Sequence, residues 1–196
     1  LAVAERPDDE GTWPWLDDLG TYDNAVLPRA LIVAGRRLER PAWVERGTEV
    51  LRWLARAQTA PAGHFRPIGN RGWWARGGRP AQWDQQPIEA LSMLEAALAA
   101  EVATGDGTFG RLAERAYAWF TGANDLGLPV ADADQGACHD GLGSGGLNPN
   151  QGAESTLAWL VAVERMRDRR LTLATADPVA SGEPERGMPA GSPARR

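Results

Sequence analysis

Two glutamates that follow amide side chains are the residues of this sequence best suited to chemistry. Each glutamate comes three residues after one amide and four residues after another. On a helix these spacings place a carboxylate and its amides on one face. The two sets are Gln85, Gln86 and Glu89, and Asn150, Gln151 and Glu154. Such a cluster both accepts from and donates to neighbouring hydroxyl groups, which is what binding of a sugar requires.

Helix capping explains the same glutamates without any ligand. With Pro87 as the first helical residue, Glu89 takes the third position, where a carboxylate meets free backbone N–H groups. The helix N-terminus favours the ionised carboxylate, so Glu89 and Glu154 suit a base or an acceptor better than a proton donor. Both interpretations, capping and a ligand pocket, stay open from the sequence.

Further carboxylates lie at helix starts and in glycine-rich loops. Asp84 precedes the helix of Glu89, and Asp140 lies in Cys138-His-Asp-Gly-Leu142. Paired carboxylates cleave glycosidic bonds, so Asp84, Asp140, Glu89 and Glu154 are the candidate catalytic residues, although the sequence selects no pair. Asp84 and the pair Asp23–Asn24 are equally expected as helix N-caps. The candidate substrate-binding residues are Asp23, Asn24, His64, Asn70, Trp73, Trp74, Gln85, Gln86, Asp125, Asn148, Asn150 and Gln151.

Five of the nine tryptophans fall outside the expected helices. An aromatic ring stacks on the apolar face of a pyranose, so Trp73 and Trp74 are a candidate sugar platform. His64, on the same loop, could hydrogen-bond a sugar or a carboxylate. Trp13 and Trp15 either line such a site or fill space between helices.

Several classes of site and partner are not expected. The single cysteine, Cys138, excludes an intramolecular disulfide. Cys138-His139 resembles the zinc-binding pair of lanthionine cyclases, but the second cysteine of that site is missing, so we expect no metal. The chain has neither a glycine-rich phosphate fingerprint nor a Gly-x-Ser-x-Gly elbow, so we expect no cofactor.

A net charge of −5 argues against nucleic acid as a partner. Because no apolar run approaches about 20 residues, we expect no membrane span and a cytoplasmic protein.

The elements that position these residues are expected to be helices. Helical periodicity dominates and no alternating strand pattern is convincing. Short turns join the first helix to the second and the third to the fourth, whereas long loops occupy 59–83 and 121–149. The expected domain is 1–170, and the Pro-, Gly- and Arg-rich segment 171–196 is expected to be a disordered tail. The expected helices are about 22–40, 41–58, 86–103, 108–120 and 150–169.

Alternate helices begin with the same chemistry. The starts at Asp23, Asp84 and Asn150 are 61 and 66 residues apart (84 − 23 and 150 − 84). This internal repeat predicts stacked helical hairpins whose first, third and fifth helices point their N-termini at one pocket. The fold class is therefore expected to be all-α, with the long loops gathered at one end.

Five motifs together resemble a bacterial family of (α/α)6 toroid proteins. They are Trp13-Pro-Trp15, Tyr22-Asp-Asn-Ala25, Pro67-Ile-Gly-Asn70, Asp84-Gln-Gln-Pro-Ile-Glu-Ala90 and Asn148-Pro-Asn-Gln-Gly-Ala-Glu-Ser-Thr156. Members of that family are commonly named glycosyltransferases, because the domain occurs beside or fused to sugar-nucleotide-dependent transferase domains. The resemblance covers about residues 12–160 and implies part of a six-hairpin, glycosidase-like toroid. It also implies a carbohydrate substrate, and upstream hairpins or a glycosyltransferase domain as partner.

Three functions follow as expectations. The first is a carbohydrate-active domain that binds or processes an oligosaccharide with a glycosyltransferase. The second is a glycoside hydrolase, phosphorylase or epimerase that acts alone through its carboxylates, and the third is a non-catalytic helical scaffold. An arc of hairpins leaves two flanks uncovered, so weak stability or association of the isolated chain is also expected.

Overall fold

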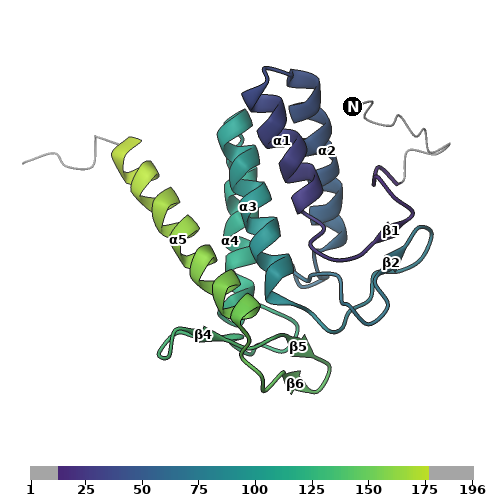
Figure 1. The fold of residues 1–196 in the computed structure, drawn as a ribbon, viewed down its shortest axis with the longest axis vertical. Coiled ribbons are helices and arrows are strands. Elements are labelled where there is room, and N and C mark those ends of the chain that lie inside the picture. The colour runs from purple at the N-terminus through teal and green to yellow at the C-terminus, as the bar shows by residue number, and fades with distance from the viewer. Residues whose placement is uncertain (1–12, 177–196) are drawn as a thin grey trace, which may run out of the picture.

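Five helices make up most of the described chain, which is mainly helical as expected. The structure, a computed structural model, describes residues 13–176 (Figure 1). No helix in that range is long and apolar enough to cross a membrane. The helices are α1 (Val26–Arg37), α2 (Pro41–Ala57), α3 (Pro87–Thr104), α4 (Gly107–Phe120) and α5 (Ala153–Ala176).

Three small antiparallel strand pairs lie outside the helices, and none of them was expected. Each strand has only two residues, too few for an alternating pattern to be visible in the sequence. One pair joins the segment before α1 to the loop after α2, with Leu19 opposite Ala75. The pairs are β1 (Leu19–Gly20) with β2 (Trp74–Ala75), β3 (Ala131–Asp132) with β4 (Ala137–Cys138), and β5 (Leu142–Gly143) with β6 (Gly146–Leu147).

Proline and glycine mark the boundaries of α2 and α3. Pro41 and Pro87 are the first residues of α2 and α3, and Gly105 ends α3 in the left-handed conformation at φ 71°. The start of α1 is later than expected, because Asp23 has a φ of +53°, which a right-handed helix cannot contain. The helix begins only at Val26.

The fifth helix extends beyond its expected end. It runs to Ala176, so residues 171–176 are helical although they were expected in the tail. Residues 177–196, the rest of the expected tail, lie outside the described residues, as do residues 1–12.

Two expected N-caps are wrong. The N-cap residues of α1 and α3 are Ala25 and Gln86, and neither makes a side-chain capping bond, so Asp23–Asn24 and Asp84 do not cap these helices. In α4 the cap is Asp106, whose carboxylate accepts from the backbone N–H of Thr108. The acidic groups before α1 and α3 therefore need another explanation.

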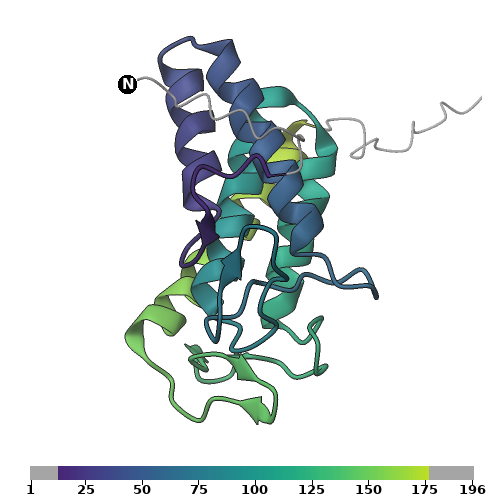
Figure 2. The same ribbon diagram turned by 90° about the vertical axis from the view of Figure 1, so that its right-hand side faces the viewer.

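The helices form two antiparallel hairpins and one further helix. Helices α1 and α2 pack as one pair, and α3 and α4 as the other; α3 also contacts α1 and α5. Figures 1 and 2 show α1, α3 and α5 in a row, with α2 and α4 on one side of it. The three helices of the row begin at the same end of the molecule, where the long loops gather, as the repeat predicted.

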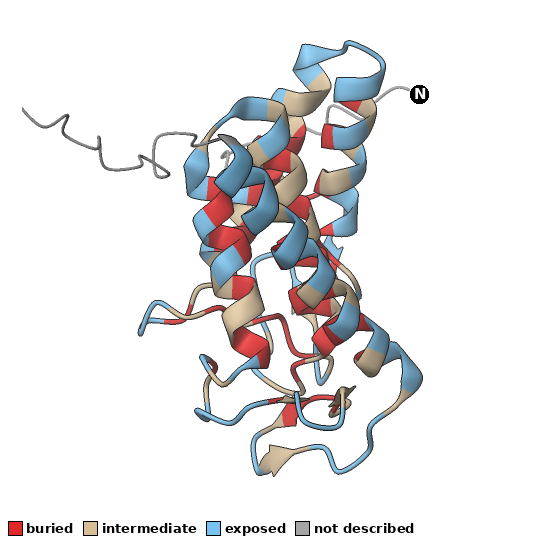
Figure 3. Cartoon of the chain, turned by 90° about the vertical axis from the view of Figure 1, so that its left-hand side faces the viewer, coloured by how far each residue is buried: buried red, intermediate tan, exposed pale blue. Residues whose placement is uncertain are grey.

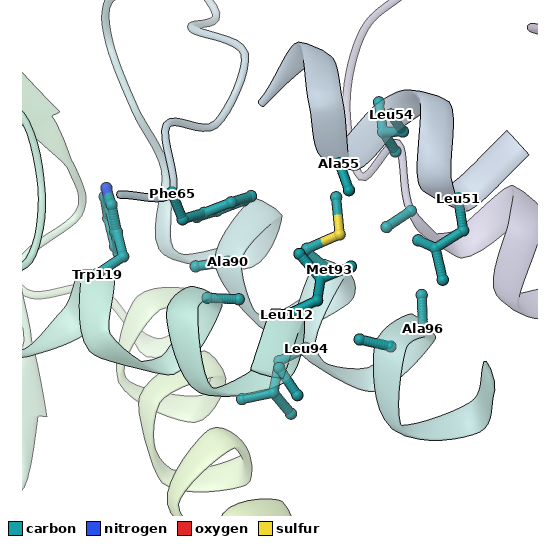
Figure 4. Packing of buried hydrophobic residues seen from close by; sticks show 14 of the residues in the cluster. Leu51, Leu54, Ala55, Phe65, Ala90, Met93, Leu94, Ala96, Leu112 and Trp119 are labelled. Carbon is teal, nitrogen blue, oxygen red and sulfur yellow. The ribbon is translucent and has the colours of Figure 1, made fainter. Parts of the chain in front are cut away.

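Helix α3 is the centre of the hydrophobic core. It is covered on several sides, and Met93 and Leu94 are fully buried on it. Figure 4 shows Met93 directed towards Leu54 and Ala55 of α2, with Trp119 of α4 further along the same core. Because neighbours surround α3, its apolar residues do not form the single stripe of a surface helix.

Close packing of α1 on α2 gives the first testable prediction. A Cβ at Gly47 would lie 2.9 Å from the carbonyl oxygen of Pro28, a backbone atom that cannot rotate away. We expect Gly47→Ala to lower the free energy of unfolding by about 1–3 kcal/mol through overpacking. Gly107→Ala is the matched control, since a Cβ there meets nothing within 4 Å. Thermal and urea unfolding would measure both; equal stability of the two variants would contradict the close contact.

Candidate functional site

A polar pocket of about 520 Å³ lies among the loops at the end where α3 begins. Three segments form it: residues 70–71 of the loop after α2, residues 84–86 just before α3, and residues 140–149, which include the β5–β6 hairpin. Its polar lining residues are Asn70, Arg71, Asp84, Gln86, Asp140 and Asn148. All of these except Arg71 are candidates from the sequence, so the structure brings five of them together.

Backbone hydrogen bonds hold the three segments of the pocket in place. Gln85 and Leu142 exchange both backbone N–H···O bonds, at 3.0 and 2.9 Å. The N–H of Asn70 donates to the carbonyl oxygen of Asp84 at 3.0 Å. Gly141 permits the approach, because a Cβ there would lie 2.6 Å from the Gln85 carbonyl oxygen. The pocket walls are therefore held together by main-chain hydrogen bonds.

Asp84 and Arg71 form an ion pair in the wall of the pocket. The Nε of Arg71 lies 2.9 Å from Oδ2 of Asp84. Their side chains are 30% exposed for Asp84 and 73% for Arg71. The pair offers a ligand both acceptors and donors at one point of the wall.

Asp140 is committed to the start of α5. Its carboxylate accepts from the N–H of Gly152 at 2.6 Å and from the side chain of Asn150. Burial works against the charged form, but these bonds and one from Ser155 hold the pKa of Asp140 below its ordinary value. Asp140 is therefore an ionised acceptor and not a proton donor.

Glu89 lies outside the lining of the pocket and is 1% exposed. One carboxylate oxygen accepts from the backbone N–H of Asp23. The other accepts from the N–H and the side-chain amide of Asn24, at 3.3 and 3.1 Å. Burial raises the pKa of Glu89 to about 7, against the effect of these donors. The carboxylate thus binds the chain that leads into α1. Asp23 and Asn24, which were candidate sugar-binding residues, contact Glu89 instead and do not line the pocket.

Glu154 is exposed and accepts from the hydroxyl of Tyr22 at 2.8 Å. Burial and the neighbouring carboxylate raise the pKa of Tyr22 to about 12, so this hydroxyl remains a donor. Since Asp23 follows Tyr22 in the chain, contacts with Glu89 and Glu154 tie the segment before α1 to the starts of both α3 and α5. The starts of the three helices meet here, beside the pocket.

A second polar network is buried around Asp125, whose side chain is 4% exposed. Arg66 binds this carboxylate through two nitrogens at 2.5–2.9 Å, and Nε2 of His64 lies 2.8 Å from it. Side-chain amides of Gln82 and Gln85 also donate to it. Burial disfavours the charge, but the donors lower the pKa of Asp125 to about 2. His64, Gln85 and Asp125 therefore join the loops together and do not line the pocket.

One of the two tryptophans expected to bind a sugar, Trp74, packs against other aromatic rings of the chain. Trp74 packs against Trp13 and Trp53 at centroid distances of 4.6 and 4.8 Å. Trp13 and Trp15 are both buried, so their packing role is the one the structure supports. Trp73 is partly buried and has a φ of +54°. It does not belong to the pocket lining.

The remaining candidates lie around the segment before α5. Gln151 is exposed, and the carbonyl of Asn150 accepts from the N–H of Asp140 at 2.9 Å. Cys138 is buried, and burial raises the pKa of its thiol to about 12. Between residues 13 and 176 no group of three or more His, Cys, Asp or Glu side chains is placed to hold a metal ion.

The sequence did not identify the two arginines that pair with candidate carboxylates, Arg71 with Asp84 and Arg66 with Asp125. Arg71 directly follows the candidate Asn70, and nothing else in the sequence indicated that it lines the pocket. Arg66 stands two residues after His64, a spacing typical of two side chains on one side of an extended segment, which could have suggested a shared partner.

The sequence matches no known family and no curated protein. The toroid resemblance and its implied activity therefore stay predictions.

The buried and exposed glutamates predict different outcomes for the same substitution. Glu89→Ala leaves the N–H groups of Asp23 and Asn24 without their acceptor, so we expect the free energy of unfolding to fall by about 1–3 kcal/mol. Glu154→Ala, the matched control, removes one exposed contact and should cost less than about 1 kcal/mol. Chemical unfolding at pH 7 measures both.

Glu89 also has a pH signature. Its folded pKa of about 7 lies above the ordinary value of 4.5. Its contribution is thus present below pH 4.5 and is lost as pH rises to 7, so wild-type stability should decrease across that range. Glu89→Ala should remove this part of the slope. An unchanged slope would show that Glu89 does not titrate as its burial implies.

The Asp125 network gives a dependence at acid pH. The folded pKa of about 2 lies below the ordinary 3.8, so the stability that Asp125 contributes is present above pH 3.8 and lost as pH falls to 2. Asp125→Asn should lose about 1–3 kcal/mol at pH 7, because Arg66 is left without its ionic partner, and should lack that acid dependence. Asp134→Asn, at an exposed turn residue, is the control. Urea unfolding between pH 2 and 7 tests this; parallel curves for Asp125→Asn and wild type would contradict it.

Proposed function

We propose that the chain is a carbohydrate-active domain that binds an oligosaccharide in the polar pocket and works with a glycosyltransferase. One observation carries the proposal. Five residues selected from the sequence for sugar chemistry come from separate segments, and all line this pocket. Its volume of about 520 Å³ is within the ordinary range for small-molecule sites.

The chemistry of the lining suits hydroxyl groups. Asn70, Gln86 and Asn148 each carry both a donor and an acceptor, and the pair of Arg71 and Asp84 adds one charge of each sign. Adjacent hydroxyls of a sugar donate and accept in the same alternating way. Asp140 adds an ionised acceptor that is already oriented by Gly152.

The same groups favour binding over hydrolysis by this chain alone. A glycosidase needs one carboxyl whose raised pKa keeps its proton at working pH. In the pocket, Asp140 has a lowered pKa and Asp84 is paired with Arg71. Glu89 has the raised pKa but is buried outside the lining. This supports a role in which a partner transferase supplies the chemistry.

The arrangement of helices supports the partial toroid as part of this proposal. Helices α1, α3 and α5 form a parallel inner row with α2 and α4 outside it, the order that stacked hairpins of a toroid require (Figure 2). Further hairpins beside this row, or a fused transferase domain, are the proposed partners. A cytoplasmic location belongs to the same proposal.

Binding to immobilised glycans, followed by calorimetry with the best ligand, tests the pocket. Asp84→Asn and Asn148→Ala should each weaken binding about 10-fold or more, because each removes a ligand contact, with little loss of stability. Asp134→Asn is the control, since this exposed carboxylate lies outside the pocket. Unchanged affinity in both pocket variants would refute the assignment.

The same experiment separates the alternative functions. Release of sugar from an oligosaccharide without any sugar nucleotide would favour a stand-alone hydrolase, phosphorylase or epimerase. Failure to bind any glycan would favour the helical scaffold, in which the carboxylates and amides serve only the fold.

A further inference from the structure

Helix α1 carries an unpartnered stripe on the side away from the core. Its buried residues are Pro28, Ile32 and Gly35. On the opposite side the exposed residues recur at spacings of four, three and four. This α1 stripe consists of Val26, Ala30, Val33 and Arg37. Three of the four are apolar, which is unusual for the exposed side of a surface helix.

Helix α5 carries a second stripe of the same kind. Its core side holds Trp159, Ala162 and Met166. On the other side Leu157 is 60% exposed and Leu160 is 43% exposed. Figure 3 views the molecule from the side of α5 and shows much of this helix in the colour of exposed residues. The α5 stripe consists of Leu157, Leu160, Glu164 and Leu171.

The two stripes match in spacing and in charge. Ala30, Val33 and Arg37 stand 4, 7 and 11 residues after Val26, the first residue of α1. Leu157, Leu160 and Glu164 stand 4, 7 and 11 residues after Ala153, the first residue of α5. A parallel pair in this register sets Ala30 against Leu157, Val33 against Leu160, and Arg37 against Glu164. An antiparallel pair over the same span would separate the two charges to opposite ends of the contact.

We propose that this chain associates with itself, with the α5 stripe of one copy packing parallel to the α1 stripe of a second copy. Neighbouring helices within one chain already use the same kind of contact. Glu95 of α3 binds Arg29 of α1 at 2.5 Å and Arg165 of α5 at 2.9 Å. The new contact continues the row of parallel helices by one more member.

The charged ends of the stripes are available for this contact. Within residues 13–176, Arg37 forms no ion pair, and Glu164 has one exposed partner, Arg167, at 3.6 Å on its own helix. Such a pair contributes little and does not compete strongly. Val33 and Arg37 also border a groove of about 500 Å³ between α1 and α3, lined by Ile32, Leu98 and Val102. A helix on the α1 stripe would cover the edge of this apolar groove.

Charge reversal of the proposed pair tests the contact on the whole chain. The molar mass of wild type should rise with concentration in sedimentation or light-scattering measurements. Arg37→Glu alone and Glu164→Arg alone each set like charges together, so association should weaken about 10- to 100-fold. An equimolar mixture of the two variants brings the two introduced charges, which are opposite in sign, against each other, and association should return. Asp134→Arg is the control, because it replaces a negative by a positive charge, as Glu164→Arg does, at an exposed turn outside both stripes.

Each outcome decides the proposal. Wild type that stays monomeric at every concentration overturns it. Association that neither single variant weakens overturns the α1–α5 register, and so does a mixture that fails to recover. Circular dichroism excludes unfolding, since both positions are exposed. Glycan binding should not change in these variants, so failure here is distinct from failure of the sugar pocket.

Discussion

A buried carboxylate at the start of α3 must be satisfied before α1 and α3 can pack together. Glu89 is 1% exposed, and its partners are the N–H groups of Asp23 and Asn24 and the side chain of Asn24. Unpaired, this group would cost several kcal/mol in an apolar setting. The chain before α1 therefore turns sharply at Asp23, which also brings Tyr22 to Glu154. These two contacts tie the segment before α1 to the starts of both α3 and α5.

The pocket depends on a second buried carboxylate. Asp125 comes from the loop after α4, and Arg66 and His64 come from the loop after α2. Gln85 donates to Asp125 and accepts from the indole of Trp119, so the same network reaches the core of α4. Loops of this length are costly to order and need such internal partners. The network thereby holds the loop after α2 and the loop after α4 against the residues that lead into α3.

The sequence was sufficient for the helices and the gathering of loops, because periodicity, Pro41, Pro87 and Gly105 act locally. It also selected five of the six polar residues that line the pocket. It could not separate Glu89 from Glu154, whose local patterns are alike. The difference arises from long-range packing, which buries one glutamate under Asn24 and leaves the other at the surface. The same limit applies to Trp74, whose stacking partner Trp53 lies on α2.

The position of each helix in the row explains where apolar residues remain exposed. Helix α3 has a neighbour on both sides within the row, so Met93, Leu94 and four of its alanines, Ala90, Ala96, Ala97 and Ala100, are fully buried. Helices α1 and α5 stand at the ends and have a neighbour on one side only. Leu157 is 60% exposed at such an end, so its side chain contributes little hydrophobic free energy there. A further helix packed on α5 would bury it. The apolar residues that α1 and α5 leave exposed are therefore those that the proposed contact between two copies of the chain would bury.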